Sequence, residues 1–136
     1  MKQIYLITED EPSNIAQISF LLGRSKINID SISMNRILDK TIITLATKSY
    51  ERALEILNIN GFKCYSDETL IVKLKNDKEE ISKLSNILEN ASISITQLTA
   101  ISEDDQQALY LIKTDKPKKA SKILQKNGYL LEEEKE

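Results

Sequence analysis

The stretch Ile15-Ala16-Gln17-Ile18-Ser19 decides the fold, because it returns 66 residues later as Ile81-Ser82-Lys83-Leu84-Ser85. Two further matches follow at shifts of 66 and 67, namely Ile27-Asn28-Ile29 with Ile93-Ser94-Ile95 and Asn60-Gly61 with Asn127-Gly128. Any two amphipathic helices produce the first match. An apolar-X-apolar tripeptide at one distance and a shared Asn-Gly pair indicate an internal duplication.

Each copy predicts the order strand, helix, strand, strand, helix, strand. In the first copy these are a strand at 4–7, a helix whose first turn holds Pro12 and which ends near Gly23, a β-branched segment at 27–34, a turn at 38–40, a strand at 41–47, a helix at 53–57 and a strand at 62–65. In the second they are a strand at 70–74, a helix at 81–88, a segment at 93–100, a polar turn at 102–105, a strand at 108–112, a helix at 120–124 and a strand at 129–131.

The pattern predicts an α+β fold of two tandem ferredoxin-like βαββαβ units, each an antiparallel four-stranded sheet with its helices on one face. The expected domains are 1–67 and 68–136. Only Ser66-Asp67-Glu68 separate them, and a linker that short should hold them as one rigid body. Sharing an edge or a face would also remove an exposed strand edge.

The composition excludes several function classes. The 136 residues include no His and one Cys, which excludes Ser-His-Asp and Cys-His catalysis and zinc sites built on His or clustered Cys within this chain. Carboxylates alone can bind Mg²⁺ or Ca²⁺, but we expect no catalytic residue, no metal and no cofactor. Cys64 reads as a buried small hydrophobe.

The charge and hydropathy patterns bear on location and partners. The net charge of −2 does not suggest a nucleic-acid binder. No apolar run is long enough to span a bilayer, and the first residues lack the apolar region of a signal peptide. A single cysteine suits a reducing compartment, so we expect a cytoplasmic protein that contacts neither nucleic acid nor membrane.

The segment Glu9-Asp10-Glu11-Pro12-Ser13-Asn14-Ile15-Ala16, followed by a helix and then by Lys26-Ile27-Asn28-Ile29-Asp30, resembles the opening of an ACT domain. That family has an acidic residue and a Pro-Gly turn after its first strand, then a helix, then Gly-Ile-Asn-Ile entering the second strand. The resemblance covers nearly the whole chain, once per repeat, and is stronger in the first. It implies a regulatory module that binds an amino acid where two such domains meet.

The resemblance implies ligand contacts on the turn and at the start of the second strand, here Asp10, Glu11, Pro12, Ser13, Asn14 and Ile15, with Asn28, Ile29 and Asp30. The chemistry agrees, because backbone N–H groups at a helix start can hold a carboxylate. Asp10, Glu11 or Asp30 would accept from the ammonium group. The opposite wall is expected at Ser94, Ile95 and Thr96 of the other copy, although contacts within one copy are the alternative.

The sequence departs from the family pattern at two places. Ser13 stands where the family usually has Gly, and its side chain narrows the approach of a ligand to the backbone. In the second copy the turn at 76–80 has neither Pro nor Gly, and Ser94 replaces the Asn of the tripeptide. We therefore expect the pair to bind one ligand or none.

Three other functions remain open. The main alternative is a ligand-free interaction module that regulates a metabolic enzyme or a transcription factor in trans, or that forms a homo-oligomer, most simply a dimer, through sheet edges. An enzyme would have to use Glu103-Asp104-Asp105, the one dense acidic cluster. A base-stacking RNA-binding sheet would have to use Tyr110, the one aromatic residue of the two predicted central strands.

Overall fold

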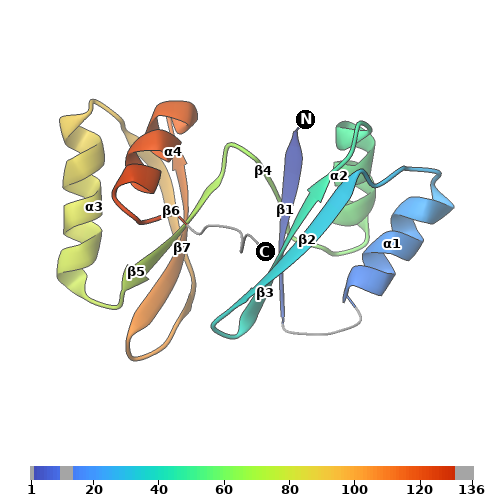
Figure 1. Ribbon diagram of the computed structural model, residues 1–136, viewed down its shortest axis with the longest axis horizontal. Helices are drawn as coiled ribbons and strands as arrows, with labels where there is room; N and C mark the ends of the chain where they lie inside the picture. The colour runs from blue at the N-terminus through green and yellow to red at the C-terminus, as the bar shows by residue number, and fades with distance from the viewer. Residues whose placement is uncertain (1, 10–13, 131–136) are drawn as a thin grey trace. The chain divides into compact units, whose positions relative to one another are not determined.

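The computed structural model describes residues 2–9 and 14–130 and has an α+β fold (Figure 1). The chain divides into two compact units, Met1–Asp67 and Glu68–Glu136, here called unit 1 and unit 2. Each unit is described by itself.

Unit 1 contains β1 (Gln3–Glu9), α1 (Asn14–Arg24), β2 (Ser31–Ile37), β3 (Lys40–Ala46), α2 (Tyr50–Ile59) and β4 (Cys64–Ser66). Its strands form an antiparallel four-stranded sheet in the order β2-β3-β1-β4, with both helices on one face (Figure 1). This is the predicted ferredoxin-like unit. On the helix side, Ile4 and Leu6 of β1 pack with Ile18 and Leu57 of the two helices in a fully buried core.

Unit 2 contains β5 (Leu70–Lys75), α3 (Lys78–Asn90), β6 (Ile95–Glu103), β7 (Gln107–Thr114) and α4 (Pro117–Lys126). Its three-stranded antiparallel sheet has the order β5-β7-β6. A single antiparallel bridge joins Val72 to Leu130 on the other side of β5. This position in unit 2 corresponds to that of β4 beside β1 in unit 1. The prediction was a strand at 129–131. Among the described residues only Leu130 forms a bridge there, and residue 131 lies outside them.

All four helices end in the same motif. The N–H of the third residue past the helix donates to the carbonyl of a buried Leu five residues earlier, and the N–H of the residue before it donates to a carbonyl three residues back, as in a Schellman motif. The pairs are Ile27 to Leu22 (2.9 Å), Phe62 to Leu57 (3.1 Å), Ile93 to Leu88 (2.9 Å) and Tyr129 to Leu124 (2.9 Å). The two halves therefore repeat in hydrogen-bond detail as well as in order.

The Asn-Gly pairs lie at two of these helix ends, those of α2 and α4. Gly61 and Gly128 adopt φ of +88° and +77°, the left-handed conformation that glycine takes without strain. Asn60 and Asn127 each donate a side-chain amide to the carbonyl four residues back, at 2.8 Å and 2.7 Å. Gly23, in contrast, lies inside α1, and Lys26 takes the left-handed position with φ of 60°.

Several predicted boundaries were wrong by a few residues. The segment 27–30 is not strand, since β2 begins at Ser31, and β6 likewise begins at Ile95. Lys40 belongs to β3 rather than to the turn, which is Leu38-Asp39 alone. The reason is the helix-end motif, which uses residues 25–27 and 91–93 to turn the chain before pairing with β3 or β7 starts.

Candidate functional site

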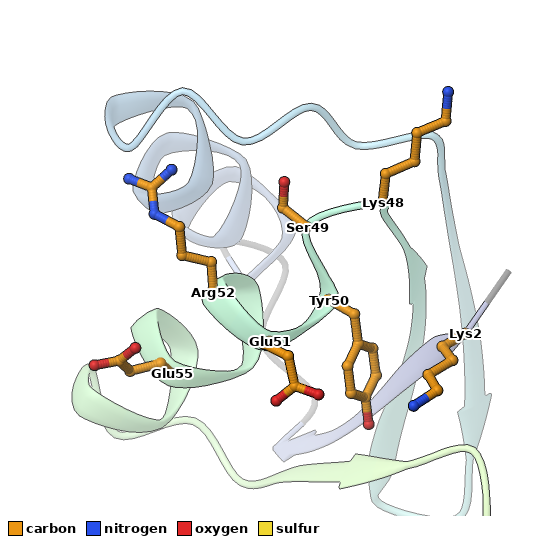
Figure 2. A pocket seen from close by; sticks show the side chains of 7 residues that line it. All are labelled: Lys2, Lys48, Ser49, Tyr50, Glu51, Arg52 and Glu55. Carbon is orange, nitrogen blue, oxygen red and sulfur yellow. The ribbon is translucent and has the colours of Figure 1, made fainter.

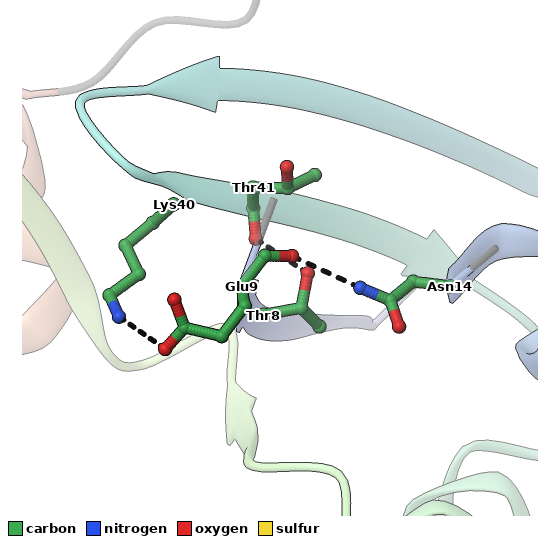
Figure 3. A network of polar contacts seen from close by, with 5 residues as sticks. All are labelled: Thr8, Glu9, Asn14, Lys40 and Thr41. Carbon is green, nitrogen blue, oxygen red and sulfur yellow. Dashed lines mark hydrogen bonds and ion pairs between the residues drawn. The ribbon is translucent and has the colours of Figure 1, made fainter. Parts of the chain in front are cut away.

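The predicted turn begins where β1 ends. Asp10, Glu11, Pro12 and Ser13 lie outside the described residues. Asn14, the first residue of α1, is 7% exposed, and its Nδ2 donates to the carbonyl oxygen of Glu9 at 3.1 Å (Figure 3). This bond holds together the two ends of segment 10–13. Ile15 packs against the core of unit 1, so both predicted site residues have structural roles here.

Lys40 is a charged neighbour of the turn that the sequence analysis did not single out. It pairs with Glu9 across β1 and β3, and its Nζ lies 2.6 Å from Oε1 of Glu9 (Figure 3). The hydrogen bond to Glu9 raises the pKa of Lys40. The pairing of β1 with β3 places this lysine beside Glu9, where segment 10–13 begins. In the sequence, Lys40 simply follows the turn at 38–39, and nothing near it indicates a binding site.

Asn28 and Asp30 stand on the approach to β2. Both are exposed, and Nδ2 of Asn28 lies 3.5 Å from Oδ1 of Asp30. Their backbone is fixed, because the buried Thr47 donates its hydroxyl to the carbonyl of Asn28 (2.7 Å) and the N–H of Asp30 donates to Ala46 (2.9 Å). Ile29 packs against the core of unit 1. The segment thus offers two polar side chains on a rigid backbone.

Within unit 1 the end of β1, where the turn begins, lies far from the segment 28–30. Gln3 and Ser31 both pair with Ala46, whereas Glu9 and Ile37 both pair with Lys40. The start of β2 is therefore level with the start of β1, and the turn leaves from the opposite end of the sheet. Six strand residues correspond to about 20 Å, which a small amino acid does not bridge. This argues against contacts that stay within one copy.

The segment 94–96 of unit 2 is built like 28–30 but bonded differently. Ser94 donates its N–H to Oδ1 of Asp115 (2.8 Å) and accepts from the N–H of Asp115 (3.1 Å). Ile95 packs against the core of unit 2. Ser94 and Thr96 are exposed, so their hydroxyl groups are what this segment presents to solvent.

The turn of unit 2 already contains its own carboxylate. Asp77 is the N-cap of α3, and its Oδ1 accepts from the N–H of Glu79 at 2.9 Å. Glu79 and Glu80 add negative charge to the first helical turn. Beside this turn lies an open hollow of about 570 Å³, lined also by Lys73 and Gln106. The capping carboxylate competes with any free carboxylate for the same N–H groups.

The acidic cluster at 103–105 builds a turn. Oδ1 of Asp104 accepts from the N–H groups of Gln106 (2.8 Å) and Gln107 (2.7 Å), which shapes the link between β6 and β7. Among the described residues no three acidic or Cys side chains gather as a metal site would require. Tyr110 packs against the core of unit 2 rather than standing free for base stacking. These placements give no support to an enzyme or an RNA-binding sheet.

A second hollow, of about 630 Å³, lies at the start of α2 in unit 1 and is lined by Lys2, Lys48, Tyr50, Arg52 and others. Nζ of Lys2 lies 5.3 Å from the centre of the Tyr50 ring. Figure 2 shows Lys48 and Arg52 pointing away from Lys2. Their charges do not converge on one point, so the hollow is not a candidate anion site.

No family model matches this chain, and no curated protein matches it. Solved structures do resemble it. A protein of Bacteroides thetaiotaomicron has 17% identity and a TM-score of 0.49, covering 96% of this chain and 90% of its own. The ligand-free regulatory subunit of aspartate kinase from Thermus thermophilus has 17% identity and a TM-score of 0.44, covering 92% and 91%.

The small subunit of acetolactate synthase from Thermotoga maritima has 14% identity and a TM-score of 0.39, covering 96% of this chain and 89% of its own. At these low identities and TM-scores, we carry no function over from any of the three proteins. Across the described residues, no helix combines the length and apolar character needed to span a bilayer.

Proposed function

We propose that this chain is a small regulatory protein of two ACT-like domains, 1–67 and 68–136, that binds a small amino acid and catalyses no reaction. The ligand lies between the turn at 10–15 and the start of a second strand from another unit, with Ser94, Ile95 and Thr96 as that wall. The observation that carries the proposal is the hydrogen bond from Asn14 to the Glu9 carbonyl, which joins the two residues that flank segment 10–13.

The turn of unit 1 suits a carboxylate better than its counterpart in unit 2. The first turn of α1 contains no acidic residue, whereas that of α3 contains two and is capped by Asp77. A ligand carboxylate would take the N–H groups of Ser13, Asn14 and Ile15, assisted by the helix dipole. We therefore propose one ligand site with the turn of unit 1 rather than two equivalent sites.

The ammonium group needs an acceptor near the same turn. Asp10 and Glu11 belong to the turn, whereas Asp30 stands at the opposite end of the sheet of unit 1, level with Gln3 rather than with Glu9. Asp10 or Glu11 is therefore the acceptor in the site formed with the turn of unit 1. Asn28 and Asp30 can serve a ligand only when another unit supplies the turn.

The experiment is a thermal-shift screen of the whole chain against the twenty amino acids, followed by calorimetry on each hit. At 100 times its dissociation constant a site-specific ligand adds about 2.7 kcal/mol of stability. Glu11→Gln or Asp10→Asn should weaken binding about tenfold or more, because a charge-assisted hydrogen bond contributes about 1.5–3 kcal/mol. Thr96→Ala tests whether the opposite wall, formed by Ser94, Ile95 and Thr96, contacts the ligand.

Asp77→Asn is the matched control, since it alters the equivalent turn of unit 2 and should leave affinity within about twofold. An amino acid that binds equally well to all four variants would overturn the site but keep the function. No binding of any amino acid at millimolar concentration would overturn the function and favour the ligand-free interaction module.

A further inference from the structure

Helix α4 of unit 2 is strongly basic, although the net charge of the chain is −2. It contains no acidic residue and four lysines, all exposed: Lys118, Lys119, Lys122 and Lys126. The corresponding helix of unit 1, α2, contains two Glu and one Arg instead. The fold therefore does not require a basic helix at this place, and the charge of α4 calls for another explanation.

One side of α4 faces the end of α3. Nζ of Lys119 donates to the carbonyl of Ala91 at 2.9 Å. Nζ of Lys116, just before the helix, donates to the carbonyl of Ser92 at 2.7 Å. Lys126 comes seven residues, or about two turns, after Lys119 and so lies on the same side of the helix.

The outer side of α4 holds two cations that these contacts do not use. Lys118 and Lys122 are four residues apart and so are neighbours on the helix surface. At 3.6 residues per turn, Lys122 lies opposite the buried Ala120 and Leu124. Neither lysine forms an ion pair with the part of the chain that the structure describes. The outer side of α4 is thus a basic surface suited to an acidic segment.

The chain returns beside α4 as the described residues end. Tyr129 and Leu130 pack against the core of unit 2, to which α4 also contributes. The N–H of Lys73 donates to the carbonyl of Tyr129 at 3.0 Å. Because the bridge of Leu130 to Val72 is antiparallel, the chain runs along β5 toward the start of that strand.

The start of β5 and the start of α4 lie at the same end of the sheet. Leu70, the first residue of β5, pairs with Ile112, and α4 begins at Pro117, five residues further on. An extended chain advances about 3.3 Å per residue. The residues that follow Leu130 therefore need only a few positions to reach the level of the first turns of α4.

The segment 132–136 contains four Glu and one Lys. We propose that this acidic segment extends the pairing along β5 and lies against the outer side of α4, where Glu132 and Glu134 form ion pairs with Lys118 and Lys122. The occupant of the basic surface is thus part of the same unit. The contact is independent of the amino-acid site.

The order of residues in the acidic segment fits this arrangement. Alternate residues of an extended chain share a face, and Leu130 packs on the face that α4 covers. Glu132 and Glu134 then point to that face as well. Glu133 and Lys135 point to the opposite face, which keeps the one basic residue of the segment away from the lysines of α4.

The ion pairs hold the fourth strand of unit 2 in place. In unit 1, β4 makes three residue pairs with β1, whereas the described residues of unit 2 make the single bridge of Leu130 to Val72. Contacts with α4 strengthen this short attachment. They also occupy Lys118 and Lys122, so an acidic partner can bind there only by displacing the segment.

Hydrogen exchange at the amide of Lys73 reports this contact, because that N–H is protected only while Tyr129 stays paired with β5. Lys122→Glu should speed the exchange at least about threefold, since it replaces an attraction by a repulsion. The N–H of Ile7, which donates to Lys63 at the corresponding place in unit 1 (3.4 Å), is the internal control and should not change.

Matched variants separate the two sides of α4 and the two faces of the segment. Lys126→Glu makes the same charge change on the side that faces α3 and should leave the exchange of Lys73 within about twofold. Adding Glu132→Lys to Lys122→Glu should restore slow exchange. Adding Glu133→Lys instead should not, because that side chain points away from α4.

Carbodiimide coupling tests direct contact in the native chain, because it joins a carboxylate to an amine that touches it. Mass spectrometry of the digested protein should find the segment 132–136 joined to Lys118 or Lys122. At about 1 M salt, where the Debye length falls to about 3 Å, this coupling and the protection of Lys73 should both decrease.

Circular dichroism of each variant checks that the fold is intact. Rescue through Glu132, together with coupling to Lys118 or Lys122, supports the proposal. An exchange rate at Lys73 that Lys122→Glu leaves unchanged, an equal effect of Lys126→Glu, or coupling spread evenly over the exposed lysines would overturn it.

Discussion

The side-chain amide of Asn14 and the carbonyl of Glu9, 3.1 Å apart, join the start of α1 to the end of β1 across four residues (Figure 3). Asn14 is 7% exposed, which is unusual for an asparagine at a helix start. Most helix-start Asn side chains accept from the next N–H groups. Here the amide donates backward instead, so it joins the two residues that flank the segment that we propose binds the ligand.

Asn14→Leu should destabilise the protein by about 1–3 kcal/mol, because the apolar side chain leaves the Glu9 carbonyl without its donor. Urea unfolding followed by circular dichroism measures the change. Asn90→Leu, at an exposed position near the end of α3, is the matched control and should change stability by less than about 0.5 kcal/mol. Equal effects of both substitutions would contradict the assigned role.

Lys26→Gly and Ser92→Gly should each stabilise the protein by up to about 1 kcal/mol. Both residues adopt φ of 60° at a helix end, where a side chain costs about 1–2 kcal/mol and glycine costs little, apart from its greater freedom when unfolded. The measurement is the thermal midpoint, which moves by about 4–8 °C per kcal/mol in domains of this size.

Gly61→Ala provides the converse control for these helix ends. A Cβ at Gly61 meets no atom within 4 Å, so any loss of stability reports the φ of +88° alone. We expect a loss of about 1–2 kcal/mol. A stabilising Gly61→Ala would show that the left-handed turn is not maintained in solution.

Cys64 should react slowly with iodoacetamide in the native protein. Burial raises the pKa of its thiol from 9.0 to about 11, so at pH 8 the reactive thiolate is about 100-fold rarer than in the unfolded chain. The comparison is the alkylation rate in buffer and in concentrated urea. A native rate within about threefold of the denatured one would contradict the shifted pKa.

The same thiol should make stability depend on pH at alkaline values. Below pH 9.0 the thiol is protonated in both states, and its contribution is fully present. As the pH rises toward 11, the unfolded chain loses this proton first, so the free energy of unfolding falls. Cys64→Ala should remove that part of the fall, and identical alkaline profiles for the two proteins would count against it.

Asp104→Ala should destabilise unit 2 by about 1–2 kcal/mol, since its carboxylate accepts two backbone N–H groups within the turn. Asp105→Ala, at the exposed neighbouring position, is the control and should stay within about 0.5 kcal/mol of the parent chain. Chemical denaturation measures both. A larger loss from Asp105 than from Asp104 would refute the structural role of this acidic cluster.

The duplication is the part of the fold that local sequence predicted best. Helix ends depend on a few neighbouring residues, and the matches at Asn60-Gly61 and Asn127-Gly128 correspond to equal hydrogen bonds in the two units. The starts of β2 and β6 were predicted too early. Alternation of apolar residues does not distinguish a strand from a loop that faces the core, and Ile29 and Ile93 lie in such loops.

The sequence indicated which residues form the candidate site, but it did not indicate which of them lie close together. Asp10 to Ile15 and Asn28 to Asp30 suggested one site because both segments resemble the family's contact positions. The pairing of Gln3 and Ser31 with the same residue, Ala46, places the two segments at opposite ends of the sheet. Lys40 reaches the turn through the same register.

By itself, the sequence determined the two-fold repeat, the order of elements, the glycine-containing helix ends and the exclusion of histidine chemistry, because these depend on composition and on contacts within about five residues. Only the tertiary structure decided which strands are neighbours, which residues share an end of the sheet, and that Lys40 lies beside Glu9. Those properties follow from pairing between strands distant in sequence, which no local pattern encodes.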